Sequence, residues 1–292
     1  MAITAALVKE LRERSGAGMM ECKKALVETD GDIDAAIEHM RKTGLAKADK
    51  KASRTAAEGK LVIQFSDDGK KAVMLEVNCE TDFVAIGDDF GNFCDTVAGQ
   101  ILNGDYADVD AVLASNYGDT STTVDDTLKG LVAKIGEKMT VRRFKVITTN
   151  GLLGQYIHGK KIGVVVELDG GTEELAKDVA MHVAATNPSA LDEAALSPEL
   201  VAKEREIASA EAANSGKPEN IIEKIVDGKI KKFMKENTLL GQAFVKDPDV
   251  TIEKLVKDAG ATILSYERIE VGAGIEKKVE NFAEEVMAQV NS

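Results

Sequence analysis

Three histidines and three cysteines are the side chains of this chain best suited to metal binding or nucleophilic chemistry. His39, His158 and His182 lie far apart in the sequence, and none has a cysteine at the spacing of a zinc site. His182 lies on an apolar helical face, which favours a packing or capping role. The many carboxylates include no pair whose spacing singles out an acid and a base. The sequence therefore predicts no metal site and no covalent catalysis.

Glycine-rich motifs that hold phosphate groups or nucleophiles are also missing. There is no GxxxxGK[ST] loop and no GxSxG turn. The run Gly272-Ala273-Gly274 begins like a GxGxxG motif, but Lys277 stands where the third glycine should be. We therefore expect no cofactor, and a binding or regulatory protein is favoured over an enzyme with its own substrate pocket.

The segment Thr81-Asp82-Phe83-Val84 stands where an apolar run, residues 72–77, gives way to polar chain. The run predicts a buried strand, and the loop after a strand is where rigid scaffolds place working side chains. Residue types alone favour a plainer interpretation, in which Phe83 turns inward and covers the local core. Both interpretations stay open at this point.

Length and charge limit the classes of protein further. A chain of 292 residues is enough for two or three domains, and a net charge of -13 argues against a general nucleic-acid binder. The charge is uneven, because residues 1–60 carry a net +2 and the remainder a net -15. This asymmetry suggests a partner with complementary patches, although a solvated surface without a partner would look the same.

Cysteine usage and hydropathy bear on the compartment. Cys22, Cys79 and Cys94 are odd in number and form no CxxC pair, which fits a reducing cytosol. The first residues lack the basic and apolar regions of a signal peptide. No apolar run approaches the roughly 18 residues of a membrane span. We expect a soluble, cytoplasmic protein that does not act on membranes.

Residues 1–45 have the apolar spacing of three short helices and predict a small docking domain, with Gly44 just beyond the third helix. Helical spacing alone would place Met19 and Met20 in the core of this bundle. Residues 46–58 are rich in alanine and lysine, which indicates a basic, partly helical linker.

The body contains an apparent duplication. Residues 61–77 and 152–168 each show two apolar runs around a glycine–lysine turn, and a helical pattern follows each pair. The pattern predicts an α+β fold with two related subdomains, each an antiparallel sheet with helices: residues 59–140, and residues 141–185 together with 237–271. Chance similarity between simple hairpins is the alternative.

Three further segments complete the predicted organisation. Residues 186–236 form a helical hairpin inserted into the second subdomain, which is either an interaction arm or an ordinary packed hairpin. Residues 103–126 contain six aspartates and no lysine or arginine, so we interpret them as a solvated connection with a short helix near 111–113. Residues 272–292 predict a C-terminal helical module, with an amphipathic helix at 279–290.

Five segments, in order along the chain, resemble the bacterial elongation factor Ts family. Residues 7–26 are LVKELRERSGAGMMECKKAL and residues 76–84 are EVNCETDFV. Shorter matches are HVAA at 182–185, GQAFV at 241–245 and GAGIEK at 272–277. The acidic stretch at 103–126 is the part that does not align clearly.

The resemblance implies a guanine-nucleotide exchange factor of translation elongation, with elongation factor Tu, GDP-bound and nucleotide-free, as its partner. Such a factor needs no covalent chemistry, no cofactor and no nucleic-acid contact. Thr81, Asp82, Phe83 and Val84 would then be the exchange loop, in which Phe83 acts as an apolar wedge and Asp82 disturbs the partner's Mg²⁺ site.

The resemblance also implies two docking regions and a homodimer contact. Arg12, Met19 and Met20 would bind the partner's GTPase domain, and His158 would contact a distal domain. Related factors can pair through the helical arm. The alternatives are a helix-recognising or chaperone-like binding protein without enzymatic activity and, less favoured, an enzyme of unknown chemistry.

Overall fold

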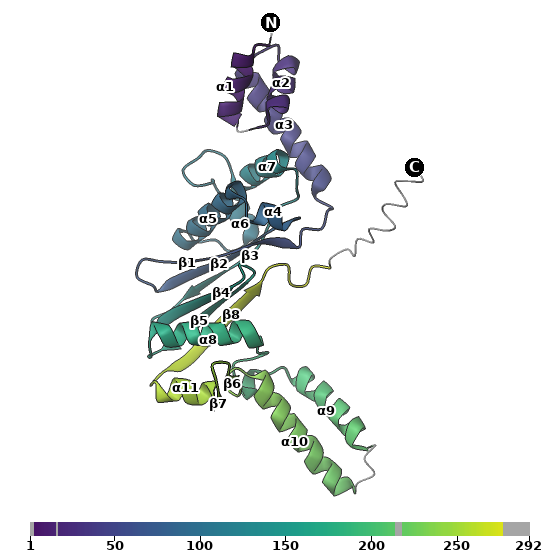
Figure 1. Ribbon diagram of the computed structural model, residues 1–292, viewed down its shortest axis with the longest axis vertical. Helices are drawn as coiled ribbons and strands as arrows, with labels where there is room; N and C mark the ends of the chain where they lie inside the picture. The colour runs from purple at the N-terminus through teal and green to yellow at the C-terminus, as the bar shows by residue number, and fades with distance from the viewer. Residues whose placement is uncertain (1–2, 16, 214–217, 277–292) are drawn as a thin grey trace. The chain divides into compact units, whose positions relative to one another are not determined.

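The computed structural model describes residues 3–15, 17–213 and 218–276 (Figure 1). The described residues form two compact units. The first comprises those within 3–64, 73–145 and 270–276, and the second comprises those within 65–72 and 146–269. Helices and small sheets alternate in both units, so the predicted α+β class is confirmed.

The chain begins with three helices, α1 (Ala5–Ser15), α2 (Met19–Glu28) and α3 (Ile33–Lys51). Their small core is made of the apolar residues Val8, Leu11, Cys22, Ala25, Leu26 and Ala36. The expectation that the third helix ends at Gly44 is wrong, because α3 continues to Lys51. Gly44 is buried, and a Cβ atom there would lie 3.2 Å from the Cβ of Ala133. The glycine therefore permits a close approach between α3 and the helix carrying Ala133.

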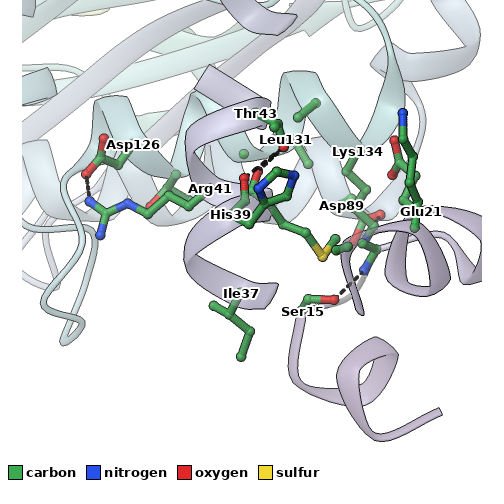
Figure 2. A pocket seen from close by; sticks show the side chains of 18 of the residues that line it. Ser15, Glu21, Ile37, His39, Arg41, Thr43, Asp89, Asp126, Leu131 and Lys134 are labelled. Carbon is green, nitrogen blue, oxygen red and sulfur yellow. Dashed lines mark hydrogen bonds and ion pairs between the residues drawn. The ribbon is translucent and has the colours of Figure 1, made fainter. Parts of the chain in front are cut away.

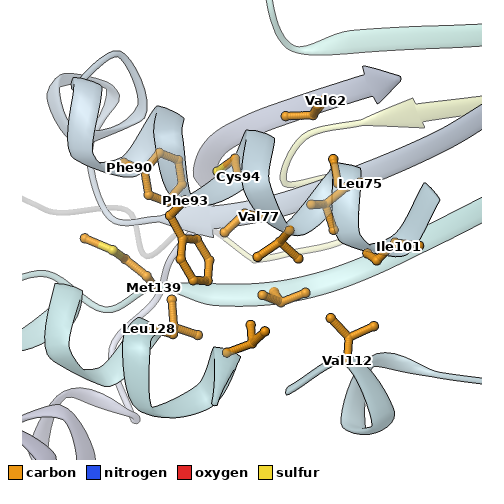
Figure 3. Close-up of a cluster of buried hydrophobic side chains, with 14 of the residues drawn as sticks. Val62, Leu75, Val77, Phe90, Phe93, Cys94, Ile101, Val112, Leu128 and Met139 are labelled. Carbon is orange, nitrogen blue, oxygen red and sulfur yellow. The ribbon is translucent and has the colours of Figure 1, made fainter. Parts of the chain in front are cut away.

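The first sheet contains β1 (Glu58–Phe65), β2 (Lys71–Cys79) and β3 (Thr140–Thr148), with β2 in the centre. Three helices pack on it, namely α5 (Asp88–Asn103), α6 (Val109–Ala114) and α7 (Val124–Ile135). Aromatic and aliphatic side chains from the sheet and helices interlock in one core (Figure 3). The short helix expected within the acidic stretch is confirmed as α6, and its Val112 is fully buried.

The second sheet is built from β4 (Leu152–His158), β5 (Ile162–Asp169) and β8 (Thr262–Glu270), in that order. Strands β4 and β5 are antiparallel, with Leu152 opposite Leu168 and His158 opposite Ile162. Helix α8 (Glu173–Thr186) packs on this hairpin. The hairpin-then-helix order of the first unit thus recurs in the second.

The remaining elements of the second unit lie between α8 and β8 in the chain. Helices α9 (Pro198–Ala213) and α10 (Glu219–Asn237) form the expected helical hairpin, which packs through Ala208, Ala212, Val226 and Ile230. A short turn, η1 (Glu193–Ala195), precedes α9. A two-stranded ladder of β6 (Ala243–Phe244) and β7 (Asp247–Thr251), which we did not expect, precedes α11 (Ile252–Asp258).

Two expectations concern the ends and hydropathy of the chain. The C-terminal helix predicted at 279–290 lies outside the described residues. Among the described helices, none combines the length and the apolar character needed to cross a membrane.

Candidate functional site

The segment singled out in the sequence forms one short helical turn at the end of the first sheet. Helix α4 comprises Asp82–Ala85, and Thr81 is its N-cap. The Thr81 hydroxyl accepts a hydrogen bond from the backbone N–H of Val84 at 3.4 Å. A threonine at this position satisfies a donor that the first helical turn leaves unpaired. The four residues are therefore held as a defined turn instead of an irregular loop.

Phe83 points away from the core. Its side chain is 81% exposed, whereas its neighbour Val84 is half-buried and packs on the first core. The packing interpretation of Phe83, which residue types alone favoured, is therefore wrong. Ile86, three residues further on, is also 68% exposed, and this spacing brings side chains onto one face of a helical turn. Phe83 and Ile86 are thus two exposed apolar side chains at helical spacing, of which the sequence analysis singled out only Phe83.

Asp82 occupies the first turn of α4, and its side chain is exposed. A carboxylate in the first turn interacts favourably with the helix dipole. Across the described part of the chain, no group of three or more His, Cys, Asp or Glu side chains is arranged to hold a metal ion. Asp82 is thus an exposed acid next to Phe83 in the chain.

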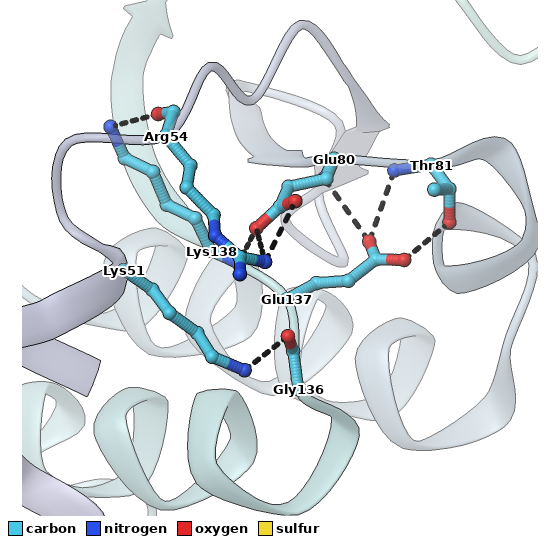
Figure 4. Close-up of polar contacts among 7 residues, drawn as sticks. All are labelled: Lys51, Arg54, Glu80, Thr81, Gly136, Glu137 and Lys138. Atoms are coloured by element: carbon cyan, nitrogen blue, oxygen red, sulfur yellow. Dashed lines mark hydrogen bonds and ion pairs between the residues drawn. The ribbon is translucent and has the colours of Figure 1, made fainter. Parts of the chain in front are cut away.

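Two carboxylates, one from each segment, fix the start of α4 to the segment between α7 and β3 (Figure 4). The Glu137 carboxylate accepts hydrogen bonds from the backbone N–H groups of Glu80 and Thr81 at 3.2 and 3.0 Å, and from the Thr81 hydroxyl at 2.7 Å. In return, Glu80 accepts a hydrogen bond from the backbone N–H of Lys138 at 2.6 Å. We name this reciprocal set of contacts the carboxylate clasp. Sequence reasoning missed it because Glu137 lies 56 residues from Thr81.

Cys79, the last residue of β2, contributes packing and no nucleophile. It is buried, and its thiol donates a weak hydrogen bond to the backbone carbonyl of Thr81 at 3.1 Å. Burial, with the nearby carboxylates of Glu137 and Glu58, raises the pKa of the Cys79 thiol to about 12. The thiolate form is thus negligible near neutral pH.

The expected docking residues of the N-terminal bundle are exposed on its surface. Arg12 lies on α1 and is exposed, while Met19 and Met20 begin α2 with 60% and 75% of their surfaces exposed. The core placement that helical spacing suggested for the two methionines is therefore wrong. An exposed methionine pair suits an adaptable contact surface.

His158 lies in the other unit, at the end of β4. Its side chain is exposed, and its Nδ1 lies 3.3 Å from the hydroxyl of Tyr156 on the same face of the strand. The two rings stack with centroids 6.2 Å apart. His158 is thus a surface residue steadied by a neighbouring aromatic ring.

His182 has the packing role expected of it. It is fully buried in α8, with its Nε2 2.9 Å from Gln242 Oε1 and its Nδ1 accepting the backbone N–H of Val245 at 3.2 Å. Burial lowers the pKa of His182, and the contact with Gln242 opposes this only in part. Two of the short motifs, HVAA and GQAFV, therefore contact each other and hold the second unit together.

A cleft of about 490 Å³ lies beside α3 in the first unit (Figure 2). Six of the side chains that line it form three pairs: Lys134 lies 2.9 Å from Asp89, His39 lies 2.7 Å from Glu28, and Arg41 pairs with Asp126. These pairs tie neighbouring helices together.

Comparison with known proteins places this arrangement among the translation elongation factors. The model of the family described as Elongation factor TS matches residues 80–273. Proteins named Elongation factor Ts are 59% identical in Thioalkalivibrio sulfidiphilus, over 99% of both chains, and 56% identical in Methylococcus capsulatus, over the full length of both. A Clostridium novyi protein of the same name is 52% identical over 99% of both chains. The chain belongs to the elongation factor Ts family.

Proposed function

We propose that this chain is the guanine-nucleotide exchange factor of elongation factor Tu and works in the cytoplasm. It binds the GDP-bound GTPase, perturbs the Mg²⁺ and nucleotide site, and so promotes GDP release. Family membership supports the choice of partner. The single structural observation that carries the proposal is the exposed Phe83, presented on a fixed turn next to Asp82.

The energetic task is one of linkage. A nucleotide bound with nanomolar affinity is held by about 12 kcal/mol. An exchange protein that prefers the nucleotide-free partner lowers the partner's affinity for GDP. By reciprocity, GDP lowers the partner's affinity for the exchange protein by the same ratio. In the exchange proposed here, no covalent bond is made or broken.

Phe83 and Asp82 would divide this task between them. Burying the exposed Phe83 ring in the partner contributes roughly 1.5–3 kcal/mol, which offsets part of the distortion imposed there. Asp82 would disturb the side chains and waters around Mg²⁺, an ion that tolerates little departure from octahedral geometry. Loosening Mg²⁺ removes the main counter-charge of the phosphates. Asp82 acts here on the surroundings of the metal and does not capture it.

Docking residues would hold the partner while the wedge acts. Arg12, Met19 and Met20 would bind the GTPase domain through the N-terminal bundle, and His158 would contact a distal domain. The arm of α9 and α10 exposes Ile207 and Ile221, and we include self-association through this arm in the proposal. Light scattering of the isolated protein tests self-association. A monomer at every concentration measured would refute it.

The decisive experiment measures release of labelled GDP from elongation factor Tu with and without this protein. We expect strong acceleration at micromolar concentration, and no acceleration would refute the proposed function. The Phe83→Ala variant should still bind elongation factor Tu, but GDP should leave the GTPase more slowly than with the wild type. Leu264→Ala, which removes another exposed apolar side chain, is the matched control and should behave as the wild type. Binding to helical segments without any effect on GDP would favour the chaperone-like alternative.

A further inference from the structure

Helix α4 is too short to hold its own geometry. It has four residues, and none of them is fully buried. Forming a single helical turn in isolation is unfavourable, because several backbone dihedrals must be fixed for one hydrogen bond. The direction in which Phe83 points therefore depends on contacts made by the residues next to α4.

Glu137 supplies most of those contacts. It is half-buried, and it receives two backbone N–H groups and one hydroxyl from Glu80 and Thr81. Hydrogen bonds to an ionised carboxylate are stronger than those to a neutral acceptor. Both N–H groups lie immediately before α4, so the negative charge of Glu137 also interacts favourably with the positive end of the turn.

The position of Glu137 is itself well fixed. It follows Gly136, which ends α7 in a left-handed conformation with a φ of 93°, and the Gly136 carbonyl accepts a hydrogen bond from the side chain of Lys51. On the other side, the backbone N–H of Lys138 is bound by Glu80. The Lys138 ammonium donates to the backbone carbonyl of Arg54 at 2.9 Å. The clasp therefore joins α4 to a rigid part of the first unit (Figure 4).

We propose that Glu137 is a positioning residue for nucleotide exchange. Through Thr81 it sets the orientation of α4, and thereby directs Phe83 and Asp82 toward the partner. The inference rests on the proposed function, which it deepens by adding a residue that does not itself touch the partner's nucleotide site. A purely structural role predicts loss of overall stability instead, so the two roles have different consequences.

The first test examines the turn in the free, full-length protein by amide hydrogen exchange. Glu137→Gln keeps the size of the side chain but places an N–H₂ group among N–H donors. We expect exchange of the Thr81 amide to accelerate about tenfold or more, the factor that corresponds to one charge-assisted hydrogen bond. Glu253→Gln makes the same chemical change on an exposed side chain of α11 and is the control. Unchanged protection of Thr81 in Glu137→Gln would overturn the proposal.

The second test separates docking from release. GDP release is measured as a function of factor concentration for wild type, Glu137→Gln and Glu253→Gln. We expect Glu137→Gln to lower the maximal rate several-fold while the half-saturating concentration stays unchanged. A rise in the half-saturating concentration, or full activity of Glu137→Gln, would overturn the positioning role alone. If wild type itself gives no acceleration, the proposed function fails as a whole, so the two failures are distinguishable.

A variant at the other end of the hydrogen bond keeps the test decisive if Glu137→Gln folds poorly. Thr81→Val removes the hydroxyl that donates to Glu137 at 2.7 Å. It should reproduce the selective loss of maximal rate. The double variant should lose less than the sum of the two single variants, because both disrupt the hydroxyl–carboxylate contact. Fully additive losses would contradict a shared role.

Discussion

The strongest stability prediction concerns Glu76, whose carboxylate is completely buried in β2. It accepts hydrogen bonds from Arg142 at 2.9 Å and Arg143 at 2.6 Å, both on β3, and from the Asn78 side chain at 3.1 Å. A fourth comes from the backbone N–H of Gly272 at 2.7 Å, just after β8. Glu76→Gln removes the charge, keeps the size and leaves these donors partly unpaired.

The expected loss of stability depends on how much of each charged group is buried. Removing one partner of a fully buried ion pair costs 3–5 kcal/mol in general. Here the side chains of Arg142 and Arg143 are 26% and 42% exposed, so water compensates part of their loss. We therefore expect Glu76→Gln to lower the free energy of unfolding by about 2–3 kcal/mol. For a chain of this size that corresponds to a fall in melting temperature of roughly 4–12 °C.

The pH dependence provides a second signature of the same contact. Burial on its own would raise the pKa of Glu76, but hydrogen bonds from Gly272, Arg142, Arg143 and Asn78 outweigh it and hold the pKa below its ordinary value of 4.5. A depressed folded-state pKa contributes stability above the unfolded-state value, and this is lost as pH falls through the folded-state value. The gap between wild type and Glu76→Gln should be constant from pH 7 to 5 and shrink below 4.5.

Melting curves by circular dichroism between pH 3 and 7 provide the measurement, with Glu253→Gln as the matched control. Glu253 is exposed, so the Glu253→Gln variant should have the same melting temperature as the wild type. Two results would refute the reasoning. One is a Glu76→Gln protein that is as stable as the wild type at pH 7. The other is a difference that persists undiminished at pH 3, which would show that carboxylate charge is not the source.

Two further predictions concern the same unit. Gly272→Ala should destabilise the protein by about 2 kcal/mol or more, because φ is +76° there and a Cβ would lie 2.1 Å from the Ala57 carbonyl oxygen; denaturation should show this, and wild-type stability would contradict it. The thiols of Cys79 and Cys94 should resist a thiol reagent at pH 8 until the chain unfolds, because burial raises the pKa of both. Titration of reactive thiols before and after denaturation checks this, and rapid labelling of the native protein would contradict it.

The elements with strong periodicity were predictable from the sequence. The two hairpins and the helices after them have long apolar patterns, and the structure places them as β1–β2–α5 and β4–β5–α8. Strand β5 was expected at 164–168 and spans Ile162–Asp169. Short elements were not predictable in this way, because two residues in β6 and four in α4 cover about one period or less.

Burial at single positions was the weakest part of the sequence analysis. Residue type favoured an inward Phe83, and helical spacing favoured inward Met19 and Met20, yet all three are exposed. Gly44 was interpreted as a helix stop, although it serves close packing of α3. Whether a side chain faces solvent, or a glycine faces a neighbouring helix, depends on the tertiary fold, which local spacing does not encode. Glu137 was missed for the same reason, since its partners lie 56 and 57 residues away.

The contrast between Phe83 and its supports bears on how a wedge can work. An exposed apolar ring gains nothing from the folded chain around it, whereas the clasp beneath it is built from hydrogen bonds of 2.6–3.2 Å. A side chain held in place before binding loses less conformational freedom when it binds, so more of the burial free energy remains to distort a partner. In a flexible loop with the same four residues, much of that free energy would be offset by the entropy lost when the loop becomes ordered on binding. The clasp, as much as Phe83, would therefore determine how fast nucleotide leaves.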